Sequence, residues 1–300
     1  MTEHPGNATK EGYVDGPRGR LYWTQEGDGG PWIVCLNGIG VAISFWEPFA
    51  RRMGRTCRVV RFDFRAHGRS DGPPDPTDIS IATCVDDTEA IVAALGIDGP
   101  VLAGHSMGGQ VCFEYYRRHP RGVAALIPTL CSAGHAIETF FDTRLSLVVF
   151  RAFKGLVRVA PGLLSQKVVR PVVLSGIAEK GARLLGIVDP KLAPHELMLP
   201  YMEQLSRTDL RSYAALAQSL QDHDASDMLA TIDVPTLVVA GERDLFTPLR
   251  LSKDLARRIP GAELLVMPGG THAALMEQPD LLALRVQKFL EERVLRRKAG

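Results

Sequence analysis

The sequence predicts an α/β fold in which a mostly parallel sheet carries helices on both faces. The first observation is that short apolar runs alternate with segments of helical periodicity along most of the chain. The second is that this alternation stops between His135 and about Leu220, where only helical periodicity remains. The third is that the pentapeptide Gly104–Gly108, with a serine at its centre, lies between an apolar run and a helical pattern.

Eight apolar segments are predicted as strands of one sheet. The first two form an antiparallel hairpin because Asp15–Gly19, between them, contains the Gly and Pro of a turn. The others are nearly continuous apolar runs such as Trp32–Leu36, typical of parallel strands buried on both faces. In chain order the predicted strands are Tyr13–Val14, Arg20–Thr24, Trp32–Leu36, Arg58–Asp63, Pro100–Ala103, Val123–Ile127, Pro235–Ala240 and Glu263–Met267.

Segments of helical periodicity lie between most of these strands. Ser44 is placed to cap the first helix, because its hydroxyl can accept a hydrogen bond from a free backbone N–H. In chain order the predicted helices are Ser44–Met53, Ser80–Leu95, the residues after Gly108 to about His119, Leu249–Arg258, and a last helix from about Glu277 onward.

The long helical stretch divides the chain into two parts. Because the alternation of strands and helices resumes after it, residues 1–134 and 222–300 are expected to form the sheet core. Residues 135–221 are expected to form a helical cap, or lid, over one edge of the sheet. This stretch is interrupted by Pro161, Pro171, Pro190, Pro194 and Pro200.

Composition and charge argue against several functions. The chain has 35 basic and 34 acidic residues, so its net charge of +1 does not favour binding to nucleic acid. Met1–Gly12 lacks the apolar centre of a secretory signal, and no apolar stretch approaches the ~18 residues of a membrane span. Five scattered cysteines fit a reducing compartment. We therefore expect a soluble cytoplasmic protein without a metal or organic cofactor, since neither a ligand cluster nor a dinucleotide fingerprint is present.

The pentapeptide has the spacing of an activated serine. A serine hydroxyl becomes a good nucleophile only when a base removes its proton, and it must protrude from the backbone to reach base and substrate. Gly104 and Gly108, two residues before and after Ser106, allow the sharp bend that this requires. The helix that follows directs free N–H groups at the same point. Ser106 is therefore the predicted nucleophile.

The base and acid are predicted in loops that follow the last two strands. His272 lies in a glycine-rich loop after Glu263–Met267, where it can reach over the sheet edge. Asp244 follows the strand that ends at Ala240 and is the preferred acid. The alternatives are Glu242 in the same loop, and Asp222, Asp224 and Asp227 further upstream.

An oxyanion that forms beside Ser106 needs two backbone donors. One is expected to be the N–H of Met107, the residue after the nucleophile. The other is expected from Ile39, because Gly38 and Gly40 on either side allow close approach of the backbone. Asn37 and Gly38 are accordingly predicted to lie against the substrate.

These motifs together resemble the α/β-hydrolase superfamily. The resemblance covers about residues 11–134 and 222–295, and it implies an α/β-hydrolase fold with Ser106, His272 and Asp244 as catalytic triad and Ile39 and Met107 as oxyanion donors. Most relatives begin the oxyanion loop with His-Gly, whereas this chain has Asn37-Gly38. The motifs that carry the resemblance are Gly104–Gly109, Asp63–Ser70, Gly241–Asp244, Thr271–His272 and Glu277–Pro279.

The resemblance leaves several reactions open. A serine at position 106 argues against the dehalogenase and epoxide hydrolase branches, which use a carboxylate nucleophile, and favours hydrolysis of a carboxylic ester through an acyl-enzyme. An enol-lactone is an alternative, because Asn37 and the proline-rich loop Phe64–Asp78 are similar to those of 3-oxoadipate enol-lactonases. Carbon–carbon bond hydrolases and cofactor-free perhydrolases use the same triad. A binding protein without turnover is a remote alternative, since such proteins usually lose a triad member.

The predicted cap should set the substrate preference. Apolar residues including Phe141 and Phe150 are interleaved with basic ones such as Arg144, Arg151 and Arg158. One interpretation is a helix that packs its apolar side on the core. The other is a pocket for an acyl chain lined by Phe141 and Phe150, which favours small to medium hydrophobic esters. We also expect a homodimer, formed through a sheet edge or through the cap, although no single motif indicates it.

Overall fold

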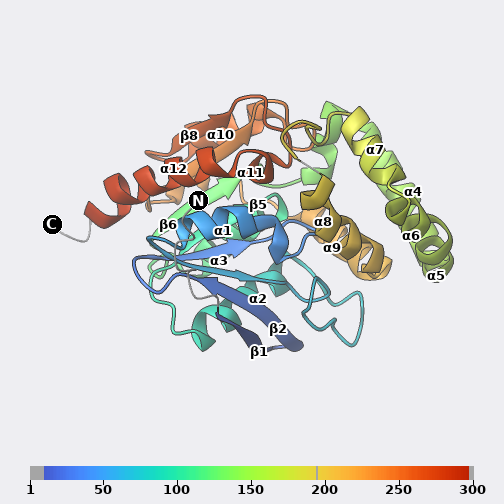
Figure 1. The fold of residues 1–300 in the computed structure, drawn as a ribbon, viewed down its shortest axis with the longest axis horizontal. Helices are drawn as coiled ribbons and strands as arrows, with labels where there is room; N and C mark the ends of the chain where they lie inside the picture. The colour runs from blue at the N-terminus through green and yellow to red at the C-terminus, as the bar shows by residue number, and fades with distance from the viewer. Residues whose placement is uncertain (1–9, 194, 297–300) are drawn as a thin grey trace, which may run out of the picture.

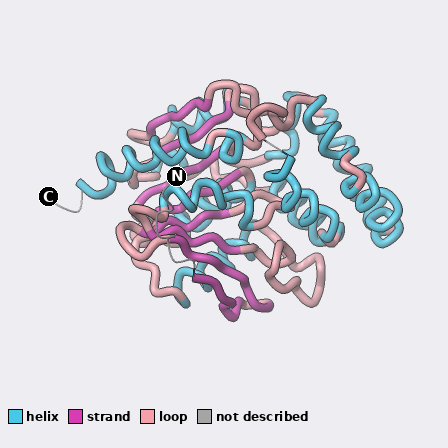
Figure 2. Tube along the Cα trace, viewed as in Figure 1, coloured by secondary structure: helices cyan, strands magenta, loops and turns pink. Residues whose placement is uncertain are grey.

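The structure, a computed structural model, describes residues 10–193 and 195–296, so most of the polar N-terminal stretch lies outside the described residues. Eight strands form one sheet in the order β1-β2-β4-β3-β5-β6-β7-β8 (Figures 1 and 2). β1 pairs antiparallel with β2 and β2 with β4, and the remaining neighbours are parallel. The predicted fold class is confirmed. The strands are β1 (Lys10–Gly16), β2 (Gly19–Glu26), β3 (Trp32–Leu36), β4 (Arg58–Phe62), β5 (Val101–His105), β6 (Ala125–Thr129), β7 (Leu237–Gly241) and β8 (Glu263–Met267).

Helices cover both faces of this sheet. Alternate residues of each buried strand point to opposite faces, so Ile33 packs in one apolar cluster and Val34 in the other. α2, α3 and α10 cover the Val34 face, and α1, α11 and α12 cover the Ile33 face. These helices are α1 (Glu47–Met53), α2 (Ile81–Ala94), α3 (Met107–Arg118), α10 (Leu249–Arg258), α11 (Ala274–Glu277) and α12 (Pro279–Phe289); the π-helix η5 (Leu290–Leu295) continues α12.

The prediction that the Ser44 side chain caps the first helix is wrong. A 3₁₀ turn, η1 (Ile43–Trp46), precedes α1, and no side chain caps it. The N–H of Ile43 instead donates to the carboxylate of Asp63 at 2.9 Å. Asp63, which follows the neighbouring strand β4, therefore binds a free N–H at the start of this turn, and Ser44 does not take the capping role expected of it.

Between β6 and β7 the chain is helical, and we call residues 135–221 the helical segment. Figure 1 shows α4, α6 and α7 as the layer farthest from the sheet, with α8 and α9 between them and the core. The division of the chain into core and cap at these boundaries stays a prediction. The elements are η2 (Ala136–Asp142), α4 (Leu145–Val159), α5 (Pro161–Leu164), the π-helix η3 (Ser165–Val169), α6 (Arg170–Leu174), α7 (Ile177–Leu184), α8 (His195–Arg207) and α9 (Leu210–Asp222).

Pro161 accounts for one break in this segment, between α4 and α5. It lies in the first turn of α5, where the missing N–H costs no hydrogen bond. Pro171 follows η3 within a continuous helical run. Pro200 lies inside α8. Among the described residues, no helix is at once long and apolar enough to span a bilayer.

Candidate active site

Ser106 lies in a strained turn between β5 and α3. Its backbone angles are φ 54° and ψ −116°, outside the regions that residues with a side chain normally adopt. A Cβ at Gly104 would lie 2.2 Å from the carbonyl oxygen of Gly108, and a Cβ at Gly108 would lie 2.2 Å from that of Leu36. Only glycine fits at both positions, which explains why the turn requires this spacing.

Three side chains from distant parts of the sequence form one hydrogen-bonded chain. The hydroxyl of Ser106 lies 3.0 Å from Nε2 of His272. On the other side of the ring, Nδ1 of His272 lies 2.9 Å and 3.1 Å from the two carboxylate oxygens of Asp244. The structure thus brings together the predicted nucleophile, base and acid in the order that proton transfer requires.

Asp244 is held as a carboxylate. Its side chain is fully buried, and it accepts hydrogen bonds from the N–H groups of Phe246 and Thr247 and from the Thr247 hydroxyl. Burial alone would raise its pKa, but the charge and hydrogen bond of His272 and the Thr247 donors hold the pKa of Asp244 below its ordinary value. A charged Asp244 fixes the His272 tautomer that leaves Nε2 free to accept a proton.

The rival carboxylates have other partners. Glu242 is exposed and accepts a hydrogen bond from the N–H of Gly269 at 2.7 Å, which stabilises the histidine loop. Asp222 pairs with Gln218, Asp224 with Ser226 and Asp227 with Arg117. These contacts favour Asp244 as the acid.

A buried carboxylate that sequence reasoning missed, Glu277, organises the loop that carries His272. It accepts hydrogen bonds from the N–H and the hydroxyl of Thr271 at 3.0 and 2.6 Å. The N–H of Asp189, in the helical segment, donates to the same carboxylate at 2.8 Å. Glu277 therefore links the helical segment to the histidine loop.

The two expected oxyanion donors, Ile39 and Met107, lie just after β3 and β5. The N–H groups of Ile39 and Met107 make no hydrogen bond to other residues among those that the structure describes. Asn37 is fully buried, and its amide donates to the carbonyl of Phe62 at 2.8 Å. It lines none of the cavities described below, so this placement does not support a direct contact between Asn37 and substrate.

His67 holds the oxyanion loop in place through two hydrogen bonds. Nε2 of His67 accepts a hydrogen bond from the N–H of Gly40 at 3.0 Å, and Nδ1 lies 2.9 Å from the carbonyl of Arg65. Burial lowers the pKa of His67, which keeps the ring neutral and able to accept. The contact arises because β3 and β4 are adjacent in the folded sheet, so that the loops that follow them meet. Nothing in the sequence alone points to it.

His105 supports the site from behind. Its Nε2 donates to the carbonyl of His272 at 3.0 Å, and its ring lies against those of Phe45 and His272. Burial, with a smaller contribution from the nearby His272, lowers the pKa of His105 to about 3. His105 is therefore neutral at physiological pH and serves as a packing and hydrogen-bonding group.

A cavity of about 260 Å³ contains Ser106 and His272. Gly38 and Ile39 contribute to its wall from the core. The opposite wall comes from the helical segment and is mainly apolar, with Glu179 as a charged member. The lining residues from that segment include Ala178, Glu179, Ala182, Met198, Tyr201 and Tyr213.

Phe141 and Phe150 line a neighbouring apolar groove of about 550 Å³. The groove and the Ser106 cavity share Ile39, Phe140 and Tyr213 as lining residues, so the two are adjacent. The predicted role of Phe141 and Phe150 in binding an acyl chain thus concerns a groove beside the serine cavity.

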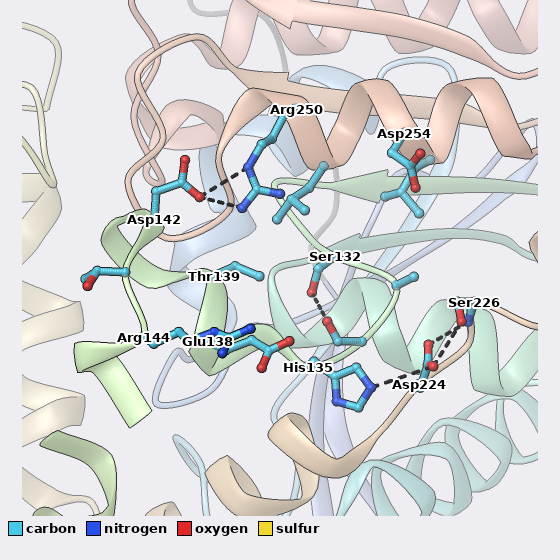
Figure 3. Close-up of a pocket in the computed structure, with 15 residues that line it drawn as sticks. Ser132, His135, Glu138, Thr139, Asp142, Arg144, Asp224, Ser226, Arg250 and Asp254 are labelled. Atoms are coloured by element: carbon cyan, nitrogen blue, oxygen red, sulfur yellow. Dashed lines mark hydrogen bonds and ion pairs between the residues drawn. The ribbon is translucent and has the colours of Figure 1, made fainter. Parts of the chain in front are cut away.

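A third, polar cavity of about 430 Å³ lies between the start of the helical segment and α10 (Figure 3). Asp142 points toward Arg250 and His135 toward Asp224, and each forms an ion pair with that partner. None of the residues predicted as triad, oxyanion donors or substrate contacts lines this cavity, although Asp224, one of the alternative acids, does. In residues 10–193 and 195–296, no three His, Cys, Asp or Glu side chains group in a way that could hold a metal ion.

Comparisons with known proteins agree with this geometry. The alpha/beta hydrolase family matches residues 33–285. The putative carbamate hydrolase RutD of Agrobacterium fabrum is 27% identical over 271 residues, covering 87% of this chain and 93% of the relative. The AB hydrolase superfamily protein YisY of Bacillus subtilis is 27% identical over 272 residues, covering 90% and 94%.

Solved structures show the same fold. The enol-lactonase from Burkholderia xenovorans LB400 superposes with a TM-score of 0.74 at 22% identity, covering 94% of this chain and 100% of its own. Est816, described as an N-acyl homoserine lactone degrading enzyme, superposes with a TM-score of 0.71 at 25% identity, covering 93% and 100%.

Proposed function

The chain belongs to the alpha/beta hydrolase family, and on that premise we propose that it is a serine hydrolase that cleaves a carboxylic ester through an acyl-enzyme on Ser106. The observation that carries the proposal is the hydrogen-bonded chain from Ser106 through His272 to the buried Asp244. Nucleophile, base and orienting acid stand within hydrogen-bond distance before any substrate is bound.

In the proposed first step, Ser106 Oγ attacks the ester carbonyl carbon while its proton moves to Nε2 of His272. The carbonyl oxygen becomes an oxyanion, for which the N–H groups of Ile39 and Met107 are the proposed donors. The bond to the alcohol then breaks, and the alcohol oxygen takes the proton from His272. Ser106 is left carrying the acyl group.

In the second step, His272 removes a proton from water, and the resulting nucleophile attacks the acyl carbon. The bond to Ser106 breaks, its oxygen regains a proton from His272, and a carboxylic acid leaves. Asp244 stays ionised throughout and stabilises the imidazolium that forms twice in the cycle.

We propose that the helical segment acts as the cap of this site. The proposal is supported by the cavity wall that Met198, Tyr201 and Tyr213 supply opposite the serine. Because this wall is mainly apolar, we expect small to medium hydrophobic acyl groups.

A carbamate or a lactone is the second candidate substrate. The relative from Agrobacterium fabrum is named a putative carbamate hydrolase, and one solved neighbour degrades N-acyl homoserine lactones according to its description. Both substrates present an acyl carbon to the same serine. Carbon–carbon bond hydrolysis and perhydrolysis use the same triad and remain alternatives.

The test is hydrolysis of p-nitrophenyl esters from acetate to decanoate by the wild-type protein and by Ser106→Ala. We expect turnover by the wild-type protein with an optimum at intermediate chain length, and none above background by the variant. Turnover that persists in Ser106→Ala would contradict the proposal. A panel of carbamates and lactones assayed in parallel identifies the second candidate.

A further inference from the structure

Most large apolar side chains that are exposed lie in one part of the described chain, between Phe141 and Leu199; the others are Tyr13, Leu284 and Leu295. Exposed apolar patches of this kind mark surfaces that bind a partner. We propose that the outer face of the helical segment, formed by α4, α6 and α7, docks on an anionic lipid surface. This proposal concerns binding and stands independently of catalysis.

On α4 the exposed apolar residues form one stripe. Their spacing of three, four and seven places them on a single side of the helix. The opposite side packs on α9, where Val157 contacts Leu210 and Ala214 in a small buried cluster. The stripe is therefore a second, uncovered apolar face. It consists of Leu145 (62% exposed), Val148 (59%), Val149 (62%), Leu156 (59%) and Val159 (85%).

The neighbouring helices continue the surface. α6 exposes Val172 and Leu174. α7 exposes Ile177 and Leu184 on its outer side, while Ala178 on its inner side lines the Ser106 cavity. Figure 1 shows α4, α6 and α7 together as the outermost layer, so one flat partner could contact all three.

The charge of this layer identifies the kind of partner. From Arg144 to Arg170 the chain carries six basic residues and no acidic one. Arg144, Arg151 and Arg158 follow one another at a spacing of seven, along one edge of the α4 stripe. Within the described part of the chain, none of the six forms an ion pair; they are Arg144, Arg151, Lys154, Arg158, Lys167 and Arg170.

An apolar stripe edged by basic side chains is the pattern of helices that lie in the headgroup region of anionic bilayers. A second copy of this chain would bring two uniformly basic faces together, and their repulsion disfavours that pairing. Charge complementarity therefore favours anionic lipid over self-association.

The apolar groove gives the lipid surface a connection to the serine. Leu145 and Val149 belong both to the exposed stripe and to the groove, and the groove shares Phe140 and Tyr213 with the Ser106 cavity. An acyl chain that enters from a docked lipid surface would follow apolar side chains to the serine. This last step alone rests on the proposed ester hydrolysis.

The test is flotation of the full-length protein with vesicles of phosphatidylcholine alone or of equal parts phosphatidylcholine and phosphatidylglycerol, at low and high salt. We expect binding to the anionic vesicles that weakens in high salt, and little binding to phosphatidylcholine. Arg151→Glu with Arg158→Glu should lower the partition coefficient by about 20-fold or more. Leu156→Ser with Val159→Ser should lower it by about tenfold.

Matched variants outside the layer serve as controls. Arg55→Glu with Arg121→Glu, and Leu284→Ser on α12, change exposed residues of the same types and should bind vesicles as the wild-type protein does. Thermal unfolding shows that each variant is folded. Absence of wild-type binding to anionic vesicles would overturn the proposal. A second result would also overturn it. In that case the wild-type protein sediments as a dimer, Leu156→Ser with Val159→Ser sediments as a monomer, and both bind vesicles equally.

Discussion

The sheet core and the outer helices of the helical segment treat apolar surface in opposite ways. In the core, strands and helices enclose two large apolar clusters, one on each face of the sheet. Between Leu145 and Leu174, by contrast, only Val157 and Val173 are buried. A helix layer with so few buried side chains gains little stability from packing and can change its contacts at low cost.

The two regions also differ in their charges. The core buries complete ion pairs, Arg61 with Glu26 and Arg65 with Asp87, whose side chains are at most 5% exposed. On α4, Arg151 and Arg158 are exposed, and neither forms an ion pair with another described residue. In the proposed function, the core carries out the chemistry and the helical segment selects the substrate.

The largest expected effect lies in the core. Asp244→Asn should lower kcat by about 10⁴-fold, because the amide leaves His272 in the wrong tautomer. Glu242→Gln, in the same loop, is the matched control and should retain most of the activity because Glu242 contacts Gly269 instead. Steady-state kinetics on the best p-nitrophenyl ester measures both. Full activity of Asp244→Asn would transfer the role of acid to Glu242.

Substitutions in the core and in the helical segment should also differ strongly in how much they lower the free energy of unfolding. Asp87→Ala leaves the Arg65 guanidinium buried without its partner and should lower the free energy of unfolding by about 3–5 kcal/mol. Asp86→Asn, which removes a half-exposed partner of Arg118, should cost about 1 kcal/mol or less. Leu156→Ala in the helical segment should cost under about 0.5 kcal/mol. Urea unfolding checks the order, and equal losses for Asp87→Ala and Leu156→Ala would contradict the comparison.

The core should also lose stability in acid. The unfolded chain protonates His105 near its ordinary pKa of about 6.5, whereas the folded protein does so only at about 3. Stability is therefore complete above pH 6.5 and falls toward pH 3 by about 1.4 kcal/mol per pH unit. Urea midpoints between pH 7 and 4 measure this slope. An unchanged slope in His105→Asn would show that another group causes it.

A smaller effect is expected at the loop that positions the oxyanion donors. His67→Ala removes the acceptor of the Gly40 N–H and should lower kcat by about 10- to 100-fold with little change in KM. His67→Gln can still accept this hydrogen bond and should recover part of the loss. A loss in KM alone, or no recovery with glutamine, would assign His67 a purely structural role.

The smallest effects should come from the helical segment. Phe141→Ala and Phe150→Ala should lower kcat/KM for the decanoate ester by about three- to tenfold and leave the acetate ester within about twofold. The effect is selective because the groove lies beside the serine cavity and only a long chain reaches it. An unchanged chain-length profile would remove the groove from the substrate path.

The sequence predicted those parts of the fold that depend on neighbouring residues. The bounds expected for Trp32–Leu36, Leu249–Arg258 and Glu263–Met267 are the bounds of β3, α10 and β8. In each case an apolar or amphipathic run is delimited by polar, glycine or proline residues close to its ends. The serine turn could be predicted equally well, because local steric constraints require its glycines.

Contacts between residues that are distant in the sequence could not be predicted in this way. Asp63 binds the N–H of Ile43, His67 binds that of Gly40 and Glu277 binds that of Asp189, and only the folded chain brings these residues together. For the helical segment, the sequence predicted helical periodicity but not the division into short α-, 3₁₀- and π-helices. The apolar residues near Phe141 and Phe150 were predicted to pack on the core or to line an acyl pocket, and the exposure of Leu145, Val148 and Val149 became visible only with the fold.

The central claim is that Ser106 carries the acyl group during turnover, and intact-protein mass spectrometry tests it most directly. The wild-type protein and Ser106→Ala are mixed with a p-nitrophenyl ester and quenched in acid within the first turnovers. We predict one added acyl group on the wild-type protein, located by peptide mapping to the segment that contains Ser106, and none on the variant. Turnover without an adduct, or an adduct that persists in Ser106→Ala, would contradict the account.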